Sequence, residues 1–202
     1  MRVLAARIWE IRAGRVPLYL LDTDIPENSL ADRNLTARLY SSDLDVRISQ
    51  EILLGIGGQR ALRALGYEPG VYHMNEGHSG LLTMELLDQE VKRAGRIKIT
   101  QNDIESVRKQ CVFTTHTPVP AGHDQFPMNL VRNVLRINED PVDLADSFSS
   151  ELVRRILRIP REYPDIREVS DESKVLNMTY LALNLSHYIN GVAKKHGEIS
   201  RL

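Results

Sequence analysis

The sequence predicts an α/β fold: part of a doubly wound domain in which helices flank a parallel sheet. Two observations carry this prediction. Short runs of β-branched and apolar residues alternate with helical patterns of ten or more residues. The 42% apolar and 26% charged shares are those of an ordinary globular protein. At 202 residues, the chain has room for one sizeable domain.

The elements follow from local patterns taken in chain order. Two strand-like runs separated by a turn around Gly14 predict a hairpin. The strongest helix signal runs from Asp43 to Leu65, with Ser42 or Asp43 as its cap and Gly66 as its end. The predicted elements are strands 3–11 and 16–21, helices 30–40 and 43–65, strand 71–74, helix 78–94, a helix opened by Thr100 or Asn102, strand 111–115, and helices 128–136, 141–158, 178–185 and 189–199, with an exposed loop over 165–174.

Composition excludes several classes of protein. The net charge is -1, from 26 basic and 27 acidic residues, and no basic block predicts a surface for nucleic acid or anionic membranes. Cys111 is the single cysteine, so an internal disulfide cannot form, and its apolar surroundings predict a core position. No apolar run approaches the roughly 20 residues of a bilayer crossing. A charge inside the first apolar run argues against a signal peptide, so we expect a cytoplasmic protein.

Polar residues gather where the strand 71–74 ends. Asn75, Glu76 and His78 follow it directly and precede a helix, so they should face a crevice at the carboxyl edge of the sheet. Amide, carboxylate and imidazole groups suit the recognition of a hydroxyl-rich ligand such as a sugar. An equally weighted alternative is a capping loop, with Asn75 as the cap and Glu76 favoured by the helix dipole.

A second polar loop follows the strand 111–115. It carries three threonines and two prolines around His116, and the prolines should present this imidazole rigidly. The alternative is a turn in which His116 is hydrogen-bonded locally. A metal site among His73, His78, His116 and His123 is possible but poorly supported, because no two histidines have helical ligand spacing. The glycines of Gly55-Ile-Gly-Gly58 lack the third glycine of a dinucleotide fingerprint, and we expect them to serve close helix packing.

Both loops resemble a known family. The runs Val-Tyr-His-Met-Asn-Glu-Gly-His-Ser at 71–79 and Val-Phe-Thr-Thr-His-Thr-Pro-Val-Pro-Ala-Gly-His-Asp-Gln-Phe-Pro at 112–127 closely resemble the α-glucan (glycogen and maltodextrin) phosphorylases, particularly their shorter bacterial and archaeal branch. The likeness extends in order to residues 16–24, 52–65, 177–183 and 189–201. It departs from the family at Gly80, where alanine is expected, and over 160–173.

The resemblance implies a fold and an activity. Members have two Rossmann-like domains facing each other across a cleft (the GT-B architecture), and they cleave terminal α-1,4-glucosidic bonds with phosphate to release glucose 1-phosphate. Residues 1–202 would then be an internal fragment of the N-terminal domain. Pyridoxal phosphate is bound by a lysine of the second domain, and no lysine of this chain falls in that motif, so the expectation is no cofactor-binding residue here and an inactive isolated chain.

The resemblance also implies residue roles and partners. His116 falls on the catalytic histidine beside the glucose 6-hydroxyl, while Glu76 and His78, with Asn75 before them, line the glucose pocket. The expected partners are an α-1,4-glucan, phosphate, glucose 1-phosphate and a complementary chain with the second domain. The alternative is a non-catalytic carbohydrate-binding or regulatory remnant. An interrupted sheet would leave an apolar edge, so we also expect a homo-oligomer.

Overall fold

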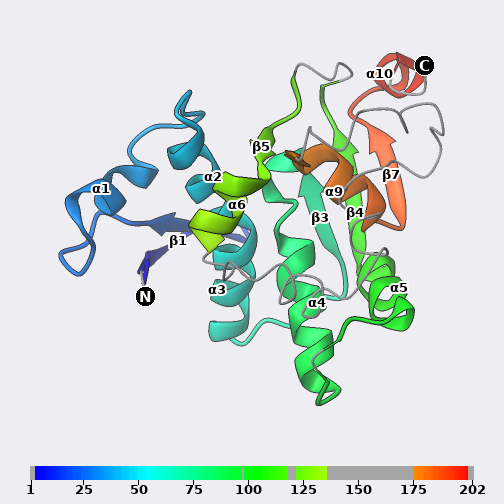
Figure 1. Cartoon of the computed structure of the whole chain (residues 1–202), viewed down its shortest axis with the longest axis horizontal. Helices are drawn as coiled ribbons and strands as arrows, with labels where there is room; N and C mark the ends of the chain where they lie inside the picture. The colour runs from blue at the N-terminus through cyan, green and yellow to red at the C-terminus, as the bar shows by residue number, and fades with distance from the viewer. Residues whose placement is uncertain (1–2, 97, 118–121, 136–174, 200–202) are drawn as a thin grey trace.

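The computed structural model describes residues 3–96, 98–117, 122–135 and 175–199 (Figure 1). Its centre is a three-stranded parallel sheet in the order β3-β4-β7, formed by Tyr72–Asn75, Cys111–Thr115 and Tyr188–Gly191. The helices α4 (Leu82–Arg93) and α5 (Gln101–Gln110) connect β3 to β4. The predicted α/β class with a parallel sheet is therefore confirmed.

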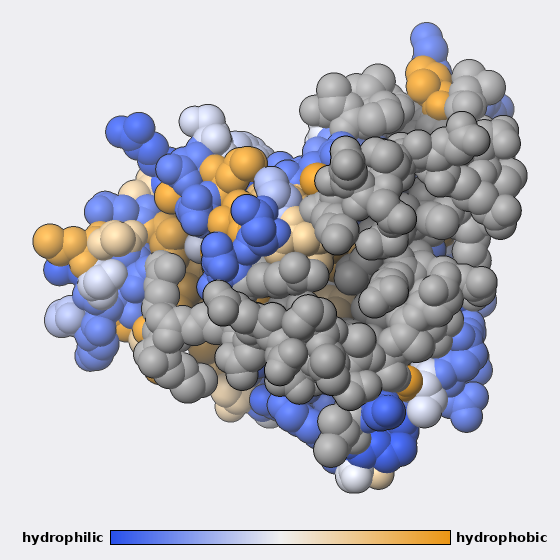
Figure 2. Space-filling model, in the orientation of Figure 1, coloured by the Kyte–Doolittle hydropathy of each residue, from blue (hydrophilic) through white to orange (hydrophobic). Residues whose placement is uncertain are grey.

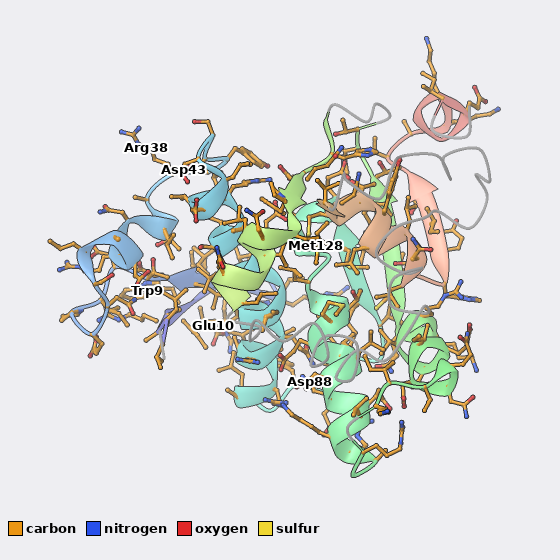
Figure 3. The ribbon with its side chains drawn as sticks, viewed as in Figure 1. Trp9, Glu10, Arg38, Asp43, Asp88 and Met128 are labelled. Carbon is orange, nitrogen blue, oxygen red and sulfur yellow. The ribbon has the colours of Figure 1, made fainter. Side chains whose placement is uncertain are left out.

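The N-terminal strands form the predicted hairpin. Strand β1 (Arg7–Ala13) pairs antiparallel with β2 (Val16–Asp22), and Gly14 takes the positive φ of +65° in the turn between them. The hairpin lies to one side of the parallel sheet, where Trp9 and Glu10 are labelled in Figure 3. Apolar side chains reach the surface on the side of the molecule where β1 and α1 lie, as Figure 2 shows.

A long helical segment connects the hairpin to the sheet. It consists of α2 (Leu44–Ile52), one π-helical stretch (Leu53–Gly57) and α3 (Gly58–Ala64). The Asp43 carboxylate caps α2 by accepting from the backbone N–H groups of Asp45 and Val46. The predicted helix over 43–65 is thus confirmed, with Asp43 rather than Ser42 as its cap.

Close packing explains one glycine within that segment. A Cβ atom built on Gly55 would lie 2.7 Å from the backbone nitrogen of Leu82 and 3.0 Å from the carbonyl carbon of Leu81. The π-helical stretch therefore contacts the start of α4 through bare backbone, and the expected packing role is confirmed at this position.

The remaining elements are short. They are α1 (Leu30–Arg33) and η1 (Asn34–Thr36), which replace the single predicted helix over 30–40, η3 (Gly77–Ser79), β5 (Gln125–Pro127), α6 (Met128–Leu135), β6 (Val175–Asn177), α9 (Met178–Asn184) and α10 (Lys194–Ile199). Strands β5 and β6 pair antiparallel. Helix α5 begins after Thr100, whose backbone N–H and hydroxyl both donate to the Asp103 carboxylate. The predictions for 141–158 and 165–174 lie outside the described residues.

The prediction of one helix over 189–199 is wrong. Residues 188–191 form strand β7, which pairs in parallel with β4, and only Lys194–Ile199 is helical. The backbone N–H of His187 also donates to the carbonyl oxygen of Cys111 at 2.9 Å, which aligns the start of β7 with β4. Tertiary pairing therefore overrides the helical periodicity of a short apolar run.

The core lies between the parallel sheet and its helices. Met74 of β3 and Phe113 of β4 are fully buried and join residues of α4, α5 and α9 in one hydrophobic cluster. Cys111 belongs to this cluster, as expected, and burial raises the pKa of its thiol to about 12. Among the helices that the structure describes, none combines the length and the hydrophobicity that a membrane crossing needs.

Candidate functional site

The two polar loops meet at the carboxyl edge of the parallel sheet. Asn75, the last residue of β3, stands opposite Thr114 of β4, which in turn stands opposite Asn190 of β7, one position before the β4–β7 pairing ends. The loops that follow β3 and β4 therefore leave the sheet side by side, as the alternation of strands and helices predicted. The backbone N–H of Glu76 donates to the Thr114 carbonyl oxygen at 2.9 Å and extends this pairing beyond the strand.

His116 is held from the other loop by two groups. Its Nε2 atom forms a short hydrogen bond with Oδ1 of Asn75, and its backbone N–H donates to Oε2 of Glu76 at 2.6 Å. Since an amide oxygen only accepts, His116 carries its proton on Nε2 when the ring is neutral. The imidazole itself is exposed, so Nδ1 is the ring atom left to meet a ligand.

Glu76 adopts an unusual backbone conformation for a residue with a side chain. Its φ of 76° and ψ of 168° lie in a region that is nearly exclusive to glycine. The residue is 8% exposed, and its two carboxylate oxygens accept from the backbone N–H groups of Gly77 at 3.1 Å and His116 at 2.6 Å. The carboxylate therefore ties the two loops together, and these bonds offset the strain of the turn.

Small residues bring the first loop against the start of α9. A Cβ atom on Gly77 would lie 3.0 Å from the backbone nitrogen and the hydroxyl of Thr179. One on Gly80 would lie 3.0 Å from the Gly77 carbonyl oxygen and 3.1 Å from that of Met178. The glycine at position 80, where the family resemblance suggested alanine, thus has a local packing reason.

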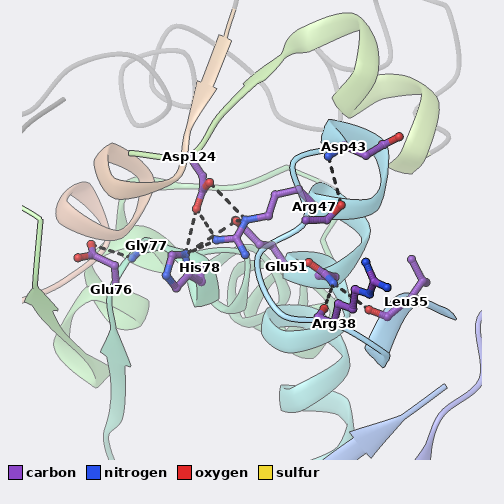
Figure 4. A network of polar contacts seen from close by, with 11 residues as sticks. Leu35, Arg38, Asp43, Arg47, Glu51, Glu76, Gly77, His78 and Asp124 are labelled. Carbon is purple, nitrogen blue, oxygen red and sulfur yellow. Dashed lines mark hydrogen bonds and ion pairs between the residues drawn. The ribbon is translucent and has the colours of Figure 1, made fainter. Parts of the chain in front are cut away.

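His78 faces a separate polar cluster, which we call the Arg47 cluster and which consists of Arg47, Glu51, His78 and Asp124 (Figure 4). Arg47 and Glu51 come from successive turns of α2, His78 from the first loop, and Asp124 from the segment before β5. The Nη2 atom of Arg47 lies 2.7 Å from Oδ2 of Asp124 and 2.7 Å from Nδ1 of His78.

Arg47 makes further close contacts in this cluster through its Nε atom and through the face of a tyrosine ring. The Nε atom of Arg47 lies 3.3 Å from Oδ1 of Asp124 and 3.1 Å from Oε1 of Glu51. The Tyr40 ring covers the cluster, with its centroid 5.0 Å from the guanidinium carbon of Arg47 and 5.5 Å from the centroid of the His78 ring. The Arg47 guanidinium thus contacts two carboxyl groups and an imidazole.

The two carboxyl groups of the cluster, those of Glu51 and Asp124, have pKa values shifted in opposite directions. Burial, together with the nearby Asp124 carboxylate, raises the pKa of Glu51 to about 9. Burial also acts to raise the pKa of Asp124, but the polar side chains in contact with its carboxylate, the charged Arg47 among them, outweigh it and hold that pKa well below its usual range. Near neutral pH, Asp124 therefore carries the negative charge opposite Arg47, and Glu51 carries a proton.

Arg47 already supplies the positive charge of this site. Glu51, His78 and Asp124 are the residues of the described chain whose ligand atoms lie close enough together to hold a metal ion. A bound metal ion would lie beside the guanidinium, which bonds the same oxygen of Asp124 and the same nitrogen of His78. The other histidines bond elsewhere: His73 to the Thr114 hydroxyl at 2.7 Å, and His123 to the Thr117 carbonyl oxygen at 3.3 Å.

A cavity of about 950 Å³ adjoins the Arg47 cluster. Its lining includes Arg47, Glu51, His78 and Ser79, together with largely apolar residues of the hairpin, α2 and α3. His116 and Asn75 are outside this lining. The structure therefore brings Asn75, Glu76 and His116 together, while His78 bonds the neighbouring cluster and borders the cavity.

Sequence reasoning missed Arg47, Glu51, Asp124 and Tyr40. One signal was available, because Arg47 and Glu51 stand four residues apart on a helix face that also carries Ile48 and Ile52. Two opposite charges on an apolar helix face predict a buried polar partner elsewhere in the fold. Nothing local to positions 40 and 124 identifies those residues.

Comparisons with known proteins relate the chain to carbohydrate phosphorylases. A family profile described as carbohydrate phosphorylase matches residues 58–201. The chain is 43% identical to a glycogen phosphorylase of Mycobacterium tuberculosis over 98% of its length, and 38% identical to a maltodextrin phosphorylase of Thermococcus litoralis over 99%. It is 32% identical to a glycogen phosphorylase of Aquifex aeolicus over 96%. The chain spans 22%, 21% and 26% of these relatives, respectively.

Proposed function

The chain belongs to the carbohydrate phosphorylase family, and we propose that it forms the glucose side of a phosphorylase cleft. The reaction is phosphorolysis of terminal α-1,4-glucosidic bonds to glucose 1-phosphate. The proposed setting is the cytoplasm, with the chain as a partial N-terminal, Rossmann-like domain of a two-domain GT-B enzyme. The relatives named as glycogen and maltodextrin phosphorylases support an α-glucan as the substrate.

The two hydrogen bonds that hold His116 in place are the observation on which the proposal rests. Asn75 fixes the imidazole and Glu76 fixes the backbone that carries it, so the ring is oriented before any ligand binds. In the proposed reaction, His116 bonds the glucose unit near its 6-hydroxyl and stabilises the developing oxocarbenium-like sugar. Such a group acts best when it does not reorganise during the reaction.

Asn75, Glu76 and His78 complete the proposed glucose subsite. Asn75 acts from the end of β3 and Glu76 from the loop that follows, and both already bond His116. His78 offers an imidazole at 27% side-chain exposure on the border of the cavity. The three side chains supply donors and acceptors that suit sugar hydroxyls.

Pyridoxal phosphate is the cofactor that the family implies, and in the complete enzyme its phosphate supplies acid–base chemistry. Its aldehyde requires a lysine, and the cavity lining contains none. Lys92, for comparison, lies on α4, exposed and paired with Asp88 at 2.5 Å. We therefore assign no cofactor contact to this cavity and propose that a complementary polypeptide provides the lysine.

A complementation assay tests the proposal. The chain is mixed with phosphate, a maltodextrin and a polypeptide that carries the remaining part of a family phosphorylase, and release of glucose 1-phosphate is measured. We expect activity only in the mixture, and its loss with His116→Ala. The control is His187→Ala, because His187 is also an exposed histidine but precedes β7. Maltodextrin binding without complementation would instead favour the carbohydrate-binding remnant.

A further inference from the structure

His78 makes two contacts through Nδ1 that cannot both be hydrogen bonds. That nitrogen lies 2.7 Å from Nη2 of Arg47 and 3.0 Å from Oδ2 of Asp124. An imidazole nitrogen either bears a proton and donates, or offers a lone pair and accepts. A guanidinium only donates and a carboxylate only accepts, so the protonation state of Nδ1 decides which contact is the bond.

The geometry of Arg47 favours the accepting state. Its Nη2 bears two hydrogens, and the two acceptors at 2.7 Å are Oδ2 of Asp124 and Nδ1 of His78. A proton on Nδ1 would face an N–H group of Nη2 across 2.7 Å, in a site where the Arg47 side chain is only 10% exposed. A lone pair on Nδ1 satisfies both hydrogens of Nη2. The Asp124 carboxylate then bonds Arg47 through both of its oxygens, and its 3.0 Å approach to Nδ1 is a close contact without a hydrogen.

The surrounding charges favour the same state. The titratable and charged groups that contact the His78 ring are Arg47, Asp124, Glu51 at 4.0 Å and the Tyr40 ring. Arg47 and Asp124 cancel, and Glu51 is protonated near neutral pH. Asp124 is thus the one charged carboxylate among these groups, and Arg47 already pairs with it at 2.7 Å.

We propose that Arg47 is a positioning residue of the candidate site, which holds His78 as the neutral tautomer with its proton on Nε2. Among the described residues, no hydrogen bond to that Nε2 is found, and the ring borders the cavity. His78 therefore presents an N–H donor, and the ligand atom that it takes is an acceptor oxygen of a sugar hydroxyl. This last step rests on the proposed function, whereas the tautomer does not.

The tautomer is measured without any ligand. Nitrogen-15 NMR of the histidine-labelled chain at about pH 7.5 distinguishes a protonated from an unprotonated ring nitrogen. We expect an unprotonated Nδ1 and a protonated Nε2 for His78 in the wild type. A proton on Nδ1, whether as the other tautomer or as an imidazolium, overturns the proposal.

Variants separate the effect of Arg47 from that of Asp124. With Arg47→Met, the remaining neighbour at 3.0 Å is an acceptor, so Nδ1 should become protonated. With Asp124→Asn, Arg47 still donates, and Nδ1 should stay unprotonated. Arg93→Met is the matched control, because Arg93 pairs with Glu90 on the surface of α4. An unchanged tautomer in Arg47→Met overturns the proposal; if that variant does not fold, the wild-type and Asp124→Asn spectra decide.

A binding measurement keeps this inference distinct from the proposed function. If His78 shows the expected tautomer and the complemented protein does not use maltodextrin, the proposed function fails and the positioning role stands. If the complemented protein uses maltodextrin but Nδ1 of His78 bears the proton, the proposed function stands and the positioning role of Arg47 fails. With both in place, Arg47→Met should weaken maltodextrin binding by about tenfold, the loss of roughly one hydrogen bond to the sugar.

Discussion

The strained turn at Glu76 leads to a quantitative prediction about substitutions at this position. The carboxylate accepts two backbone N–H groups, from Gly77 and His116, and a hydrogen bond to a charged group contributes about 1.5–3 kcal/mol. Against this, a side chain at φ 76° and ψ 168° costs on the order of 1–3 kcal/mol. The choice of the substituted residue therefore separates the loss of the two hydrogen bonds from the relief of the backbone strain.

Three substitutions separate the two effects. Glu76→Gln retains one acceptor oxygen and should cost about 1.5–3 kcal/mol of unfolding free energy. Glu76→Ala loses both bonds, keeps the strain and should cost about 3–5 kcal/mol. Glu76→Gly loses both bonds but adopts the conformation freely, so it should be about 1–3 kcal/mol more stable than Glu76→Ala. At an ordinary position, glycine would be the less stable of the two.

Urea unfolding followed by far-ultraviolet circular dichroism measures all three variants, with the linear slope checked for constancy. Gly58→Ala serves as the control, because a Cβ atom there would meet nothing within 4 Å. Two results would refute the reasoning. One is a glycine variant no more stable than the alanine variant, and the other is a glutamine variant equal to the wild type.

Further predictions concern Glu51, Gly55, Asp103 and the hairpin. Because burial raises the pKa of Glu51 to about 9 from 4.5, its contribution to stability is fully present below about pH 4.5 and is lost as the pH rises toward 9. Glu51→Gln should therefore gain about 1–3 kcal/mol over the wild type near pH 8 and nothing near pH 4.5; an equal difference at both pH values in thermal unfolding would contradict this. Gly55→Ala should lose about 1–3 kcal/mol in urea unfolding because its Cβ would lie 2.7 Å from the Leu82 nitrogen, and Gly58→Ala should not; equal effects would refute the packing argument. Hydrogen bonding from Arg96 holds the pKa of Asp103 well below its usual range, so the stability it contributes is present at neutral pH and lost in acid. Asp103→Asn should thus be less stable than the wild type at pH 7, with the gap closing in acid unfolding curves; a constant gap would count against the ion pair. The exposed hairpin pairs Trp9–Leu20 and Ile11–Leu18 should cause concentration-dependent self-association, and a monomer by light scattering at high concentration would disprove it.

Local patterns were sufficient for much of the fold. Strand 111–115 was predicted with the bounds it has, because an apolar, strand-like run stops abruptly there in a polar loop rich in threonine and proline. The hairpin and the helix capped by Asp43 were equally local in origin. Strands β5 and β6 were missed because each has three residues and the pairing joins Gln125 to Asn177, far apart in the chain.

The same distinction applies to the candidate site. Asn75, Glu76 and His116 were found because each follows a predicted strand directly, and parallel strands place such loops together. The sequence could not show which of them holds the loops together and which is left to contact a ligand. Only the structure shows that the Glu76 carboxylate accepts from backbone N–H groups. Arg47 and Asp124 are 77 positions apart, so their contact depends on the packing of α2 against the segment before β5.

The two-stranded hairpin has a consequence for the motions of this chain. A sheet of two strands is marginal by itself, and both outer edges of β1 and β2 lack a strand neighbour in the described chain. β4, by contrast, has a partner on each side and ends at the residue before His116. Amide hydrogen exchange should therefore release the hairpin first and β4 last. The loops that hold His116 would stay formed while the N-terminal strands open and close.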